Sequence, residues 1–113
     1  MIEQVNPDQL PTWFEAVRVH GEPVLLDVRE PAEWNAASVK PTGADLVLMS
    51  MQTIPSRLAE LDPERPVAVL CHHGARSMNV AVFLERQGFS HVVNVAGGID
   101  AWSLRFDPSV PRY

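Results

Sequence analysis

The residues of this sequence that can do chemistry gather in one short segment, CHHGARS, which runs from Cys71 to Ser77. The segment holds the only cysteine of the chain, followed by two histidines, a glycine, an arginine and a serine. A cysteine thiolate is both a nucleophile and a metal ligand, whereas a buried thiol is an inert small hydrophobe. Cys71 therefore has three possible roles, as core filler, metal ligand or nucleophile.

The nucleophilic role is favoured by the residues around Cys71. An apolar run ends at this cysteine and a helix is predicted to follow, so several amide N–H groups at the helix start lack intrahelical partners. Such a helix start, together with a nearby cation, stabilises a thiolate. Gly74 allows a tight turn, Arg76 offers a permanent charge with a bidentate fork, and Ser77 can cap the helix or bind an anion. We expect a cradle for a thiolate and a small anionic substrate.

A metal site is not expected in this segment. Cys71, His72 and His73 are adjacent, and adjacent residues rarely converge on one ion. A zinc site would also need more ligands at wider spacing, and the sequence has no second cluster of ligands. His72 and His73 are predicted to be loop residues that adjust the local charge near neutral pH.

The elements that position the segment follow from hydrophobic patterning. Asn6-Pro7 predicts the start of a helix that continues to about His20 and ends at Gly21. Short apolar runs predict buried strands over 23–28, 66–71 and 91–98, and a further strand follows a loop within 40–51. Helices are predicted after the cysteine loop, over 99–106, as one turn in the segment EPAEW, and from Pro55 through PSRLAEL.

Alternating strands and helices imply a parallel sheet with right-handed crossovers and helices on both faces. In such sheets ligands lie beyond the carboxyl ends of the strands, which is where Cys71 falls. We expect the 113 residues to form a single domain, residues 1–113, because the chain is too short for two ordinary ones.

Composition limits the partners and the compartment. The net charge of −5 argues against nucleic acid as a main partner. The first residues lack the basic start and apolar core of a secretory signal, and no apolar run approaches the roughly 20 residues that span a bilayer. One cysteine cannot form an internal disulfide. We therefore expect a cytoplasmic protein with a reduced thiol and no membrane partner.

Three motifs in order resemble those of the rhodanese family in its single-domain form, over nearly the whole chain. They are VLLDVREPAEW (24–34), CHHGARS, which fits C-x-x-G-x-R-S, and NVAGGIDAW (94–102). The resemblance implies a three-layer α/β fold around a parallel sheet of about five strands, and a cysteine that carries sulfur as a persulfide without a cofactor. The stretch AASVKPTGADLV (36–47) departs from the family's G-H-I-x-G-A segment and lacks its histidine.

The resemblance also implies the reaction. Rhodanese-like sulfurtransferases have four residues between cysteine and arginine, as here, whereas related phosphatases have five. We expect sulfur to move from a small anionic donor such as thiosulfate to Cys71, and then to cyanide, a thiol or a partner protein. A non-catalytic rhodanese-like binding module, and less so a phosphatase-like relative, remain alternatives.

The expected site residues have three kinds of role. Cys71 is the catalytic residue. Asp27 and Arg29 either orient the loop or form a buried ion pair that fixes the end of a strand. The residues expected to bind substrate are His72, His73, Gly74, Ala75, Arg76 and Ser77.

Overall fold

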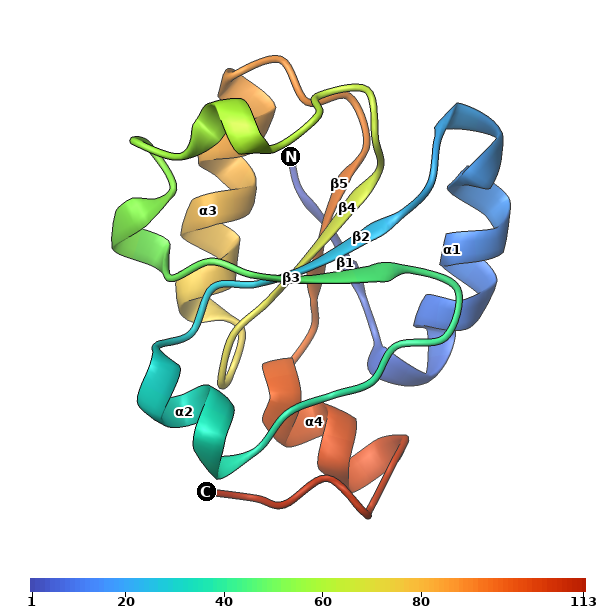
Figure 1. Ribbon diagram of the computed structural model, residues 1–113. Helices are drawn as coiled ribbons and strands as arrows, with labels where there is room; N and C mark the ends of the chain where they lie inside the picture. The colour runs from blue at the N-terminus through green and yellow to red at the C-terminus, as the bar shows by residue number, and fades with distance from the viewer.

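The computed structural model describes residues 1–113 as an α/β fold built on one parallel sheet of five strands (Figure 1). The strand order across the sheet is β1-β5-β4-β2-β3, and every neighbouring pair is parallel. The strands are β1 (Glu3–Val5), β2 (Val24–Asp27), β3 (Asp45–Leu48), β4 (Val67–Leu70) and β5 (Val92–Val95). The predicted fold class is confirmed. No apolar run indicated β1, because two of its three residues are exposed at the edge of the sheet.

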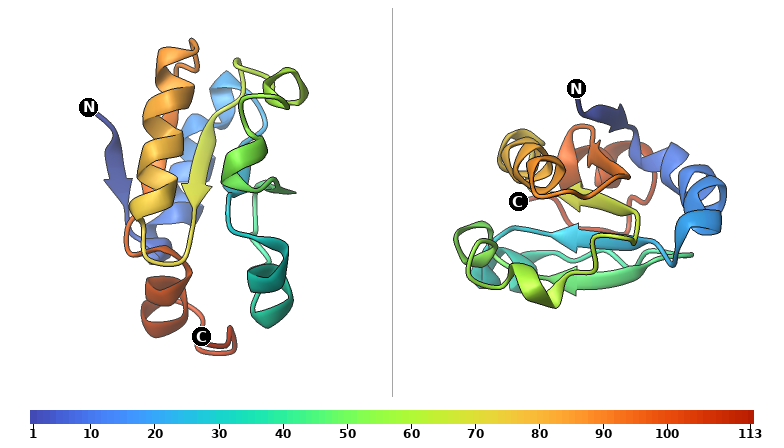
Figure 2. Two further views of the ribbon diagram at one scale, coloured as in Figure 1. Left: turned by 90° about the vertical axis from the view of Figure 1, so that its left-hand side faces the viewer. Right: turned by 90° about the horizontal axis from the view of Figure 1, so that it is seen from above.

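Helices cover both faces of the sheet, so the molecule has three layers (Figure 2). The α-helices are α1 (Leu10–Val17), α2 (Pro31–Ala36), α3 (Ala75–Arg86) and α4 (Gly98–Arg105). Short 3-10 helices are η1 (Pro7–Gln9), η2 (Arg18–His20), η3 (Met51–Thr53) and η4 (Leu58–Glu60). Helix α3 packs on one face together with η3, whereas α1 and α4 pack on the other.

The two central strands explain the continuous apolar runs of the sequence. Successive residues of a strand point to opposite faces, so a strand covered on both sides is apolar throughout. In β2, Leu26 joins the core beneath α3, and its neighbour Leu25 joins the core beneath α1 and α4. Residues 67–70 of β4 are likewise all buried.

The helix predicted from Pro55 is wrong. Residues 55–57 form turns, and only the 3-10 helix η4 follows them. Pro55 and the Asp62-Pro63 dipeptide leave fewer than ten residues for a helix, which is too few for a stable helix without strong packing. Ile54 and Leu61 are buried on either side of this segment and attach it to the core.

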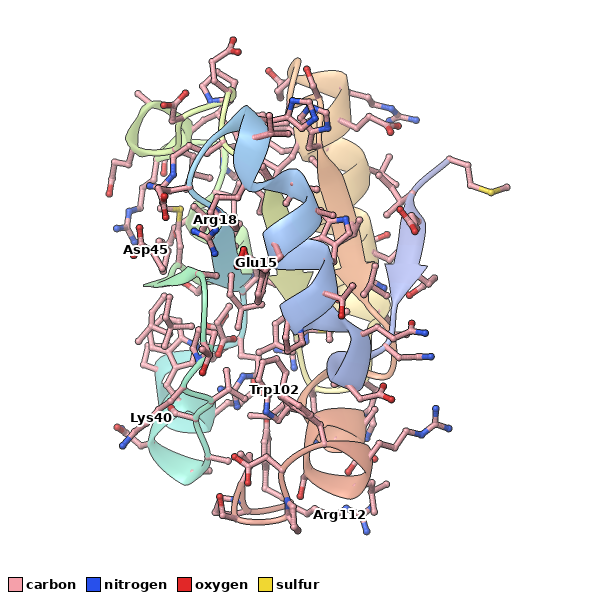
Figure 3. The ribbon with its side chains drawn as sticks, turned by 90° about the vertical axis from the view of Figure 1, so that its right-hand side faces the viewer. Glu15, Arg18, Lys40, Asp45, Trp102 and Arg112 are labelled. Carbon is pink, nitrogen blue, oxygen red and sulfur yellow. The ribbon has the colours of Figure 1, made fainter.

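The stretch that departs from the family pattern runs as a loop from α2 to β3. Ala37 and Val39 are buried in the core that α1 and α4 cover. Arg18, the first residue of η2 directly after α1, is labelled in Figure 3. It donates a hydrogen bond of 2.7 Å to the carbonyl of Gly43 and so attaches the loop to this helical segment. The loop therefore follows a defined course without the family's histidine.

The carboxyl ends of the central strands lie at the lower end of the molecule in Figure 1. Helices α2 and α4 and the C-terminus gather at the same end, as the second view also shows (Figure 2). The loop that carries Cys71 joins β4 to α3 at this end. No helix of the protein combines the length and the apolar character that crossing a membrane requires.

Candidate active site

Cys71 lies directly after β4, and its thiol faces the start of α3. The side chain is buried, and its Sγ accepts a hydrogen bond of 3.0 Å from the backbone N–H of Gly74. Gly74 is the N-cap of α3 and has a φ of 107°, a left-handed conformation that favours glycine. Ser77 Oγ lies 3.2 Å from the sulfur. The structure thus brings a helix N-terminus to the sulfur, as the sequence predicted.

Backbone hydrogen bonds from the N-terminus of α4 hold the cysteine loop in place. The N–H of Ile99 donates to the carbonyl of Cys71 at 2.8 Å, and the N–H of Asp100 donates to the carbonyl of His72 at 3.1 Å. In a trans peptide the C=O and the following N–H point in opposite directions. The amides of His72 and His73 therefore point away from α4, so the clamp by α4 sets the orientation of the loop amides.

Asn94 is a buried polar residue of β5 that holds the cysteine loop through hydrogen bonds. Its Oδ1 accepts a hydrogen bond from the Ser77 hydroxyl, and its Nδ2 donates to the carbonyl of Gly74 at 3.1 Å and to Gln4 Oε1 at 3.0 Å. Every polar atom of this amide is thus engaged, which fixes its orientation. Our sequence analysis missed Asn94, although a lone polar residue inside the apolar run HVVNV was a usable signal.

Arg76 does not point a free guanidinium at the sulfur. Its Nη1 and Nη2 donate to the two carboxylate oxygens of Glu33, in α2, at 2.7 and 2.8 Å. This bidentate pairing raises the pKa of Arg76 above its ordinary value. The predicted binding of an anionic donor by Arg76 stays a prediction, and such a donor would have to share the guanidinium with Glu33.

Asp27 and Arg29 form a buried ion pair with a distance of 2.7 Å between Arg29 Nη2 and Asp27 Oδ2. Arg29 also donates to the carbonyls of Glu33 and Ala37, at 3.1 and 2.9 Å, and to the hydroxyl of Tyr113 at 2.9 Å. Arg29 therefore ties the end of β2 to α2 and to the C-terminal residue. No hydrogen bond joins this pair directly to the cysteine loop.

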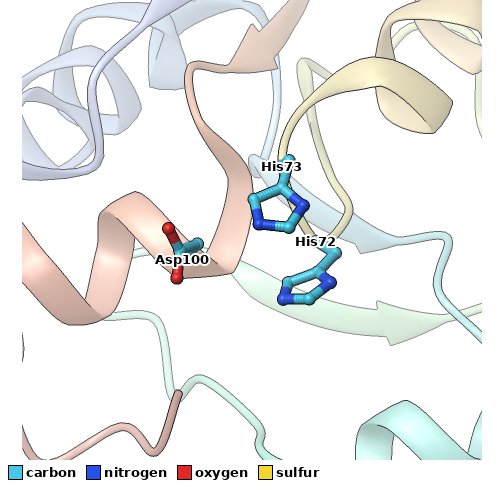
Figure 4. A group of neighbouring side chains, drawn as sticks. All are labelled: His72, His73 and Asp100. Carbon is cyan, nitrogen blue, oxygen red and sulfur yellow. The ribbon is translucent and has the colours of Figure 1, made fainter. Parts of the chain in front are cut away.

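His72 and His73 lie stacked on the outer side of the loop, with ring centroids 3.9 Å apart, and Asp100 of α4 lies beside them (Figure 4). One ligand atom from each residue lies within 4.8 Å of the others, so two imidazoles and a carboxylate could hold a metal ion. Our sequence analysis did not foresee Asp100. Its carboxylate already accepts a hydrogen bond of 2.9 Å from Arg112, which lowers the pKa of Asp100.

Tyr113 covers the other side of His72. The two rings are stacked with centroids 4.0 Å apart and an angle of 7° between their planes. The tyrosine hydroxyl donates to Glu33 Oε2 at 2.8 Å. The C-terminal residue thus packs against the loop and also holds the carboxylate that binds Arg76, an arrangement that nothing in the sequence pattern indicated.

The ion pair between Glu33 and Arg76 should make the stability of the protein depend on pH. Hydrogen bonds from Arg76 lower the pKa of Glu33 from 4.5 to about 2. A depressed carboxyl pKa stabilises the folded state fully above the unfolded-state value, and this contribution disappears as the pH falls toward the folded-state value. The difference in unfolding free energy between the wild type and Glu33→Gln should be constant above about pH 5 and shrink between pH 4.5 and 2. Denaturant unfolding of both proteins at a series of pH values measures this difference in free energy. A difference that stays constant down to pH 3 contradicts the role of the ion pair.

These features define a class of protein in which a parallel α/β sheet presents a lone cysteine to a helix N-terminus at its carboxyl edge. The family model of the rhodanese-like domain matches residues 7–105. The chain belongs to the rhodanese-like domain family.

Relatives and solved structures agree with this family. The chain is 46% identical, over 99% of its length, to the rhodanese-like/PpiC domain-containing protein 12 of Arabidopsis thaliana, and spans 38% of that protein. It is 35% identical to a thiosulfate sulfurtransferase of Pseudomonas syringae, over 85% of this chain and 86% of the relative. A rhodanese-related protein of Thermoplasma volcanium is similar in structure, with a TM-score of 0.77 and 27% identity over 98% of this chain and 99% of that one.

Proposed function

We propose that this chain is a sulfurtransferase that carries sulfane sulfur as a persulfide on Cys71. The position of Cys71 Sγ carries this proposal, because the sulfur lies at the end of β4 and accepts the N–H of Gly74 at the start of α3. Backbone N–H groups aimed at a sulfur stabilise a thiolate and also a persulfide anion. Relatives named as sulfurtransferases support the same function for this chain.

The reaction is a double displacement. The Cys71 thiolate attacks the outer sulfur of the donor, a sulfur–sulfur bond forms, and the donor's own sulfur–sulfur or sulfur–sulfonate bond breaks. With thiosulfate the leaving group is sulfite. An acceptor nucleophile, such as cyanide, a thiol or a cysteine of a partner protein, then attacks the outer sulfur of the persulfide and releases the Cys71 thiolate.

The remaining loop residues have supporting roles in this proposal. The N–H of Gly74 donates to the sulfur, and the amides of His72 and His73 are expected to complete the cradle. Ser77 Oγ accepts from the Cys71 thiol, because its own proton is donated to Asn94. Asp27 and Arg29 support the loop indirectly, because they hold α2 and therefore Glu33 in place. Four residues between Cys71 and Arg76 favour a single sulfur atom over the tetrahedral phosphate of the related phosphatases.

The test is the mass of the protein after incubation with a sulfane donor. Thiosulfate or a small-molecule persulfide should add the mass of one sulfur atom to Cys71, and cyanide should then remove it as thiocyanate. Peptide mapping locates the added sulfur. A protein that gains no sulfur from either class of donor is a binding module and not a sulfurtransferase.

A further inference from the structure

The charges beside the cysteine loop are balanced. Three arginines lie in or next to the loop, and each is bound to a carboxylate. The pairs are Arg76 with Glu33 at 2.7 Å, Arg29 with Asp27 at 2.7 Å and Arg112 with Asp100 at 2.9 Å. The whole chain carries a net charge of −5. None of these three arginines therefore offers an unpaired positive charge to an incoming dianion.

Glu33 is held in place more firmly than an ordinary surface carboxylate. It accepts two hydrogen bonds from Arg76, one from the hydroxyl of Tyr113 at 2.8 Å and one from the backbone N–H of Glu30 at 3.1 Å. These bonds occupy both carboxylate oxygens and keep the group ionised at any pH near neutrality, since its pKa is lowered to about 2. Glu33 is therefore a permanent anion fixed on the guanidinium of Arg76.

We propose that Glu33 is the specificity-determining residue of the sulfur site, an internal anion that selects persulfides of thiols as donors over oxyanion donors such as thiosulfate. This inference rests on the proposed sulfur transfer. Thiosulfate brings two negative charges to the Cys71 thiolate, so three charges of one sign meet in the loop. A persulfide on an uncharged body brings at most one. Without an unpaired arginine the dianion meets the larger repulsion.

The favoured reaction is balanced without any co-reactant. The Cys71 thiolate attacks the terminal sulfur of R–S–SH, the Cys71 sulfur–sulfur bond forms, and the donor's sulfur–sulfur bond breaks. The electron pair of the broken bond leaves with the thiolate R–S⁻, and the proton stays on the new persulfide or passes to solvent. Sulfane sulfur only changes its carrier, so no net oxidation occurs.

The experiment compares the rates at which Cys71 gains sulfur from thiosulfate and from N-acetylcysteamine persulfide, whose body is uncharged. The wild type should have the higher kcat/KM for the persulfide. Glu33→Gln removes the internal charge and frees Arg76, so kcat/KM for thiosulfate should rise about tenfold or more relative to that for the persulfide. Glu60→Gln is the matched control, because Glu60 pairs bidentately with Arg57 outside the loop. It should leave the ratio unchanged.

A second measurement needs no variant. Between about 0.01 M and 0.1 M salt the Debye length falls from about 30 to about 10 Å. The wild-type reaction with thiosulfate should become faster over this range, because screening weakens repulsion between like charges, and the persulfide reaction should respond less. An equal donor ratio in the wild type and Glu33→Gln, or a thiosulfate rate that falls with salt, overturns the role of Glu33. Sulfur gain from neither donor overturns the proposed function instead.

Discussion

Replacing Cys71 by serine is expected to abolish sulfur transfer and to leave the fold intact. Cys71 is the only cysteine, so no other thiol can form the persulfide. A serine hydroxyl fits the same space and can accept the N–H of Gly74 that now binds the sulfur. The rate of thiocyanate formation should therefore fall by at least about 10³-fold, to the level without enzyme. The free energy of unfolding should change by about 1 kcal/mol or less.

The control restores a thiol at another position. Ser90 is exposed in the turn between α3 and β5, and Cys71→Ser combined with Ser90→Cys supplies a free cysteine away from the loop. This double variant should remain inactive if the loop amides are required. Transfer at the wild-type rate by Cys71→Ser alone, with unchanged stability, would remove Cys71 from the mechanism.

Replacing Gly98 by alanine is expected to damage both the fold and the site. Gly98 has a φ of 62°, and an added Cβ would lie 2.4 Å from the carbonyl oxygens of Cys71 and His72. A methyl carbon and a carbonyl oxygen cannot approach so closely, so either α4 or the cysteine loop must move. We expect a loss of about 3 kcal/mol or more in stability. A shift of the loop by about 1 Å would also reduce the transfer rate by on the order of a hundredfold.

Gly88→Ala separates the clash from the cost of backbone conformation. Gly88 also has a positive φ, of 97°, but no atom lies within 4 Å of the position of an added Cβ. The Gly88→Ala variant should lose about 1–2 kcal/mol of stability, which is the cost of a left-handed conformation for alanine, and should keep its transfer rate. Thermal unfolding and steady-state assays on both variants test the comparison. Equal losses in the two would show that the contact between Gly98 and the loop is unimportant.

Much of this protein could be predicted from the sequence because the relevant physics is local. The apolar runs that became β2, β4 and β5 depend on consecutive residues. The helix that starts at Ala75 follows a glycine with a φ of 107°, and Gly74 together with the position of Cys71 was enough to predict that a helix N-terminus faces the sulfur. The one wrong helix, from Pro55, was also local, because the segment is too short to form a helix without strong packing.

The tertiary structure decided what the loop residues bind. The partner of Arg76 is Glu33, 43 residues away, and the partner of Ser77 is Asn94, 17 residues away. Spacing along the chain does not specify such contacts, because they exist only once the strands have taken their order in the sheet. The sequence alone therefore predicted a nucleophilic cysteine near a cationic side chain. Only the folded chain shows that a carboxylate from α2 already neutralises that cation and that the N-terminus of α4 holds the loop.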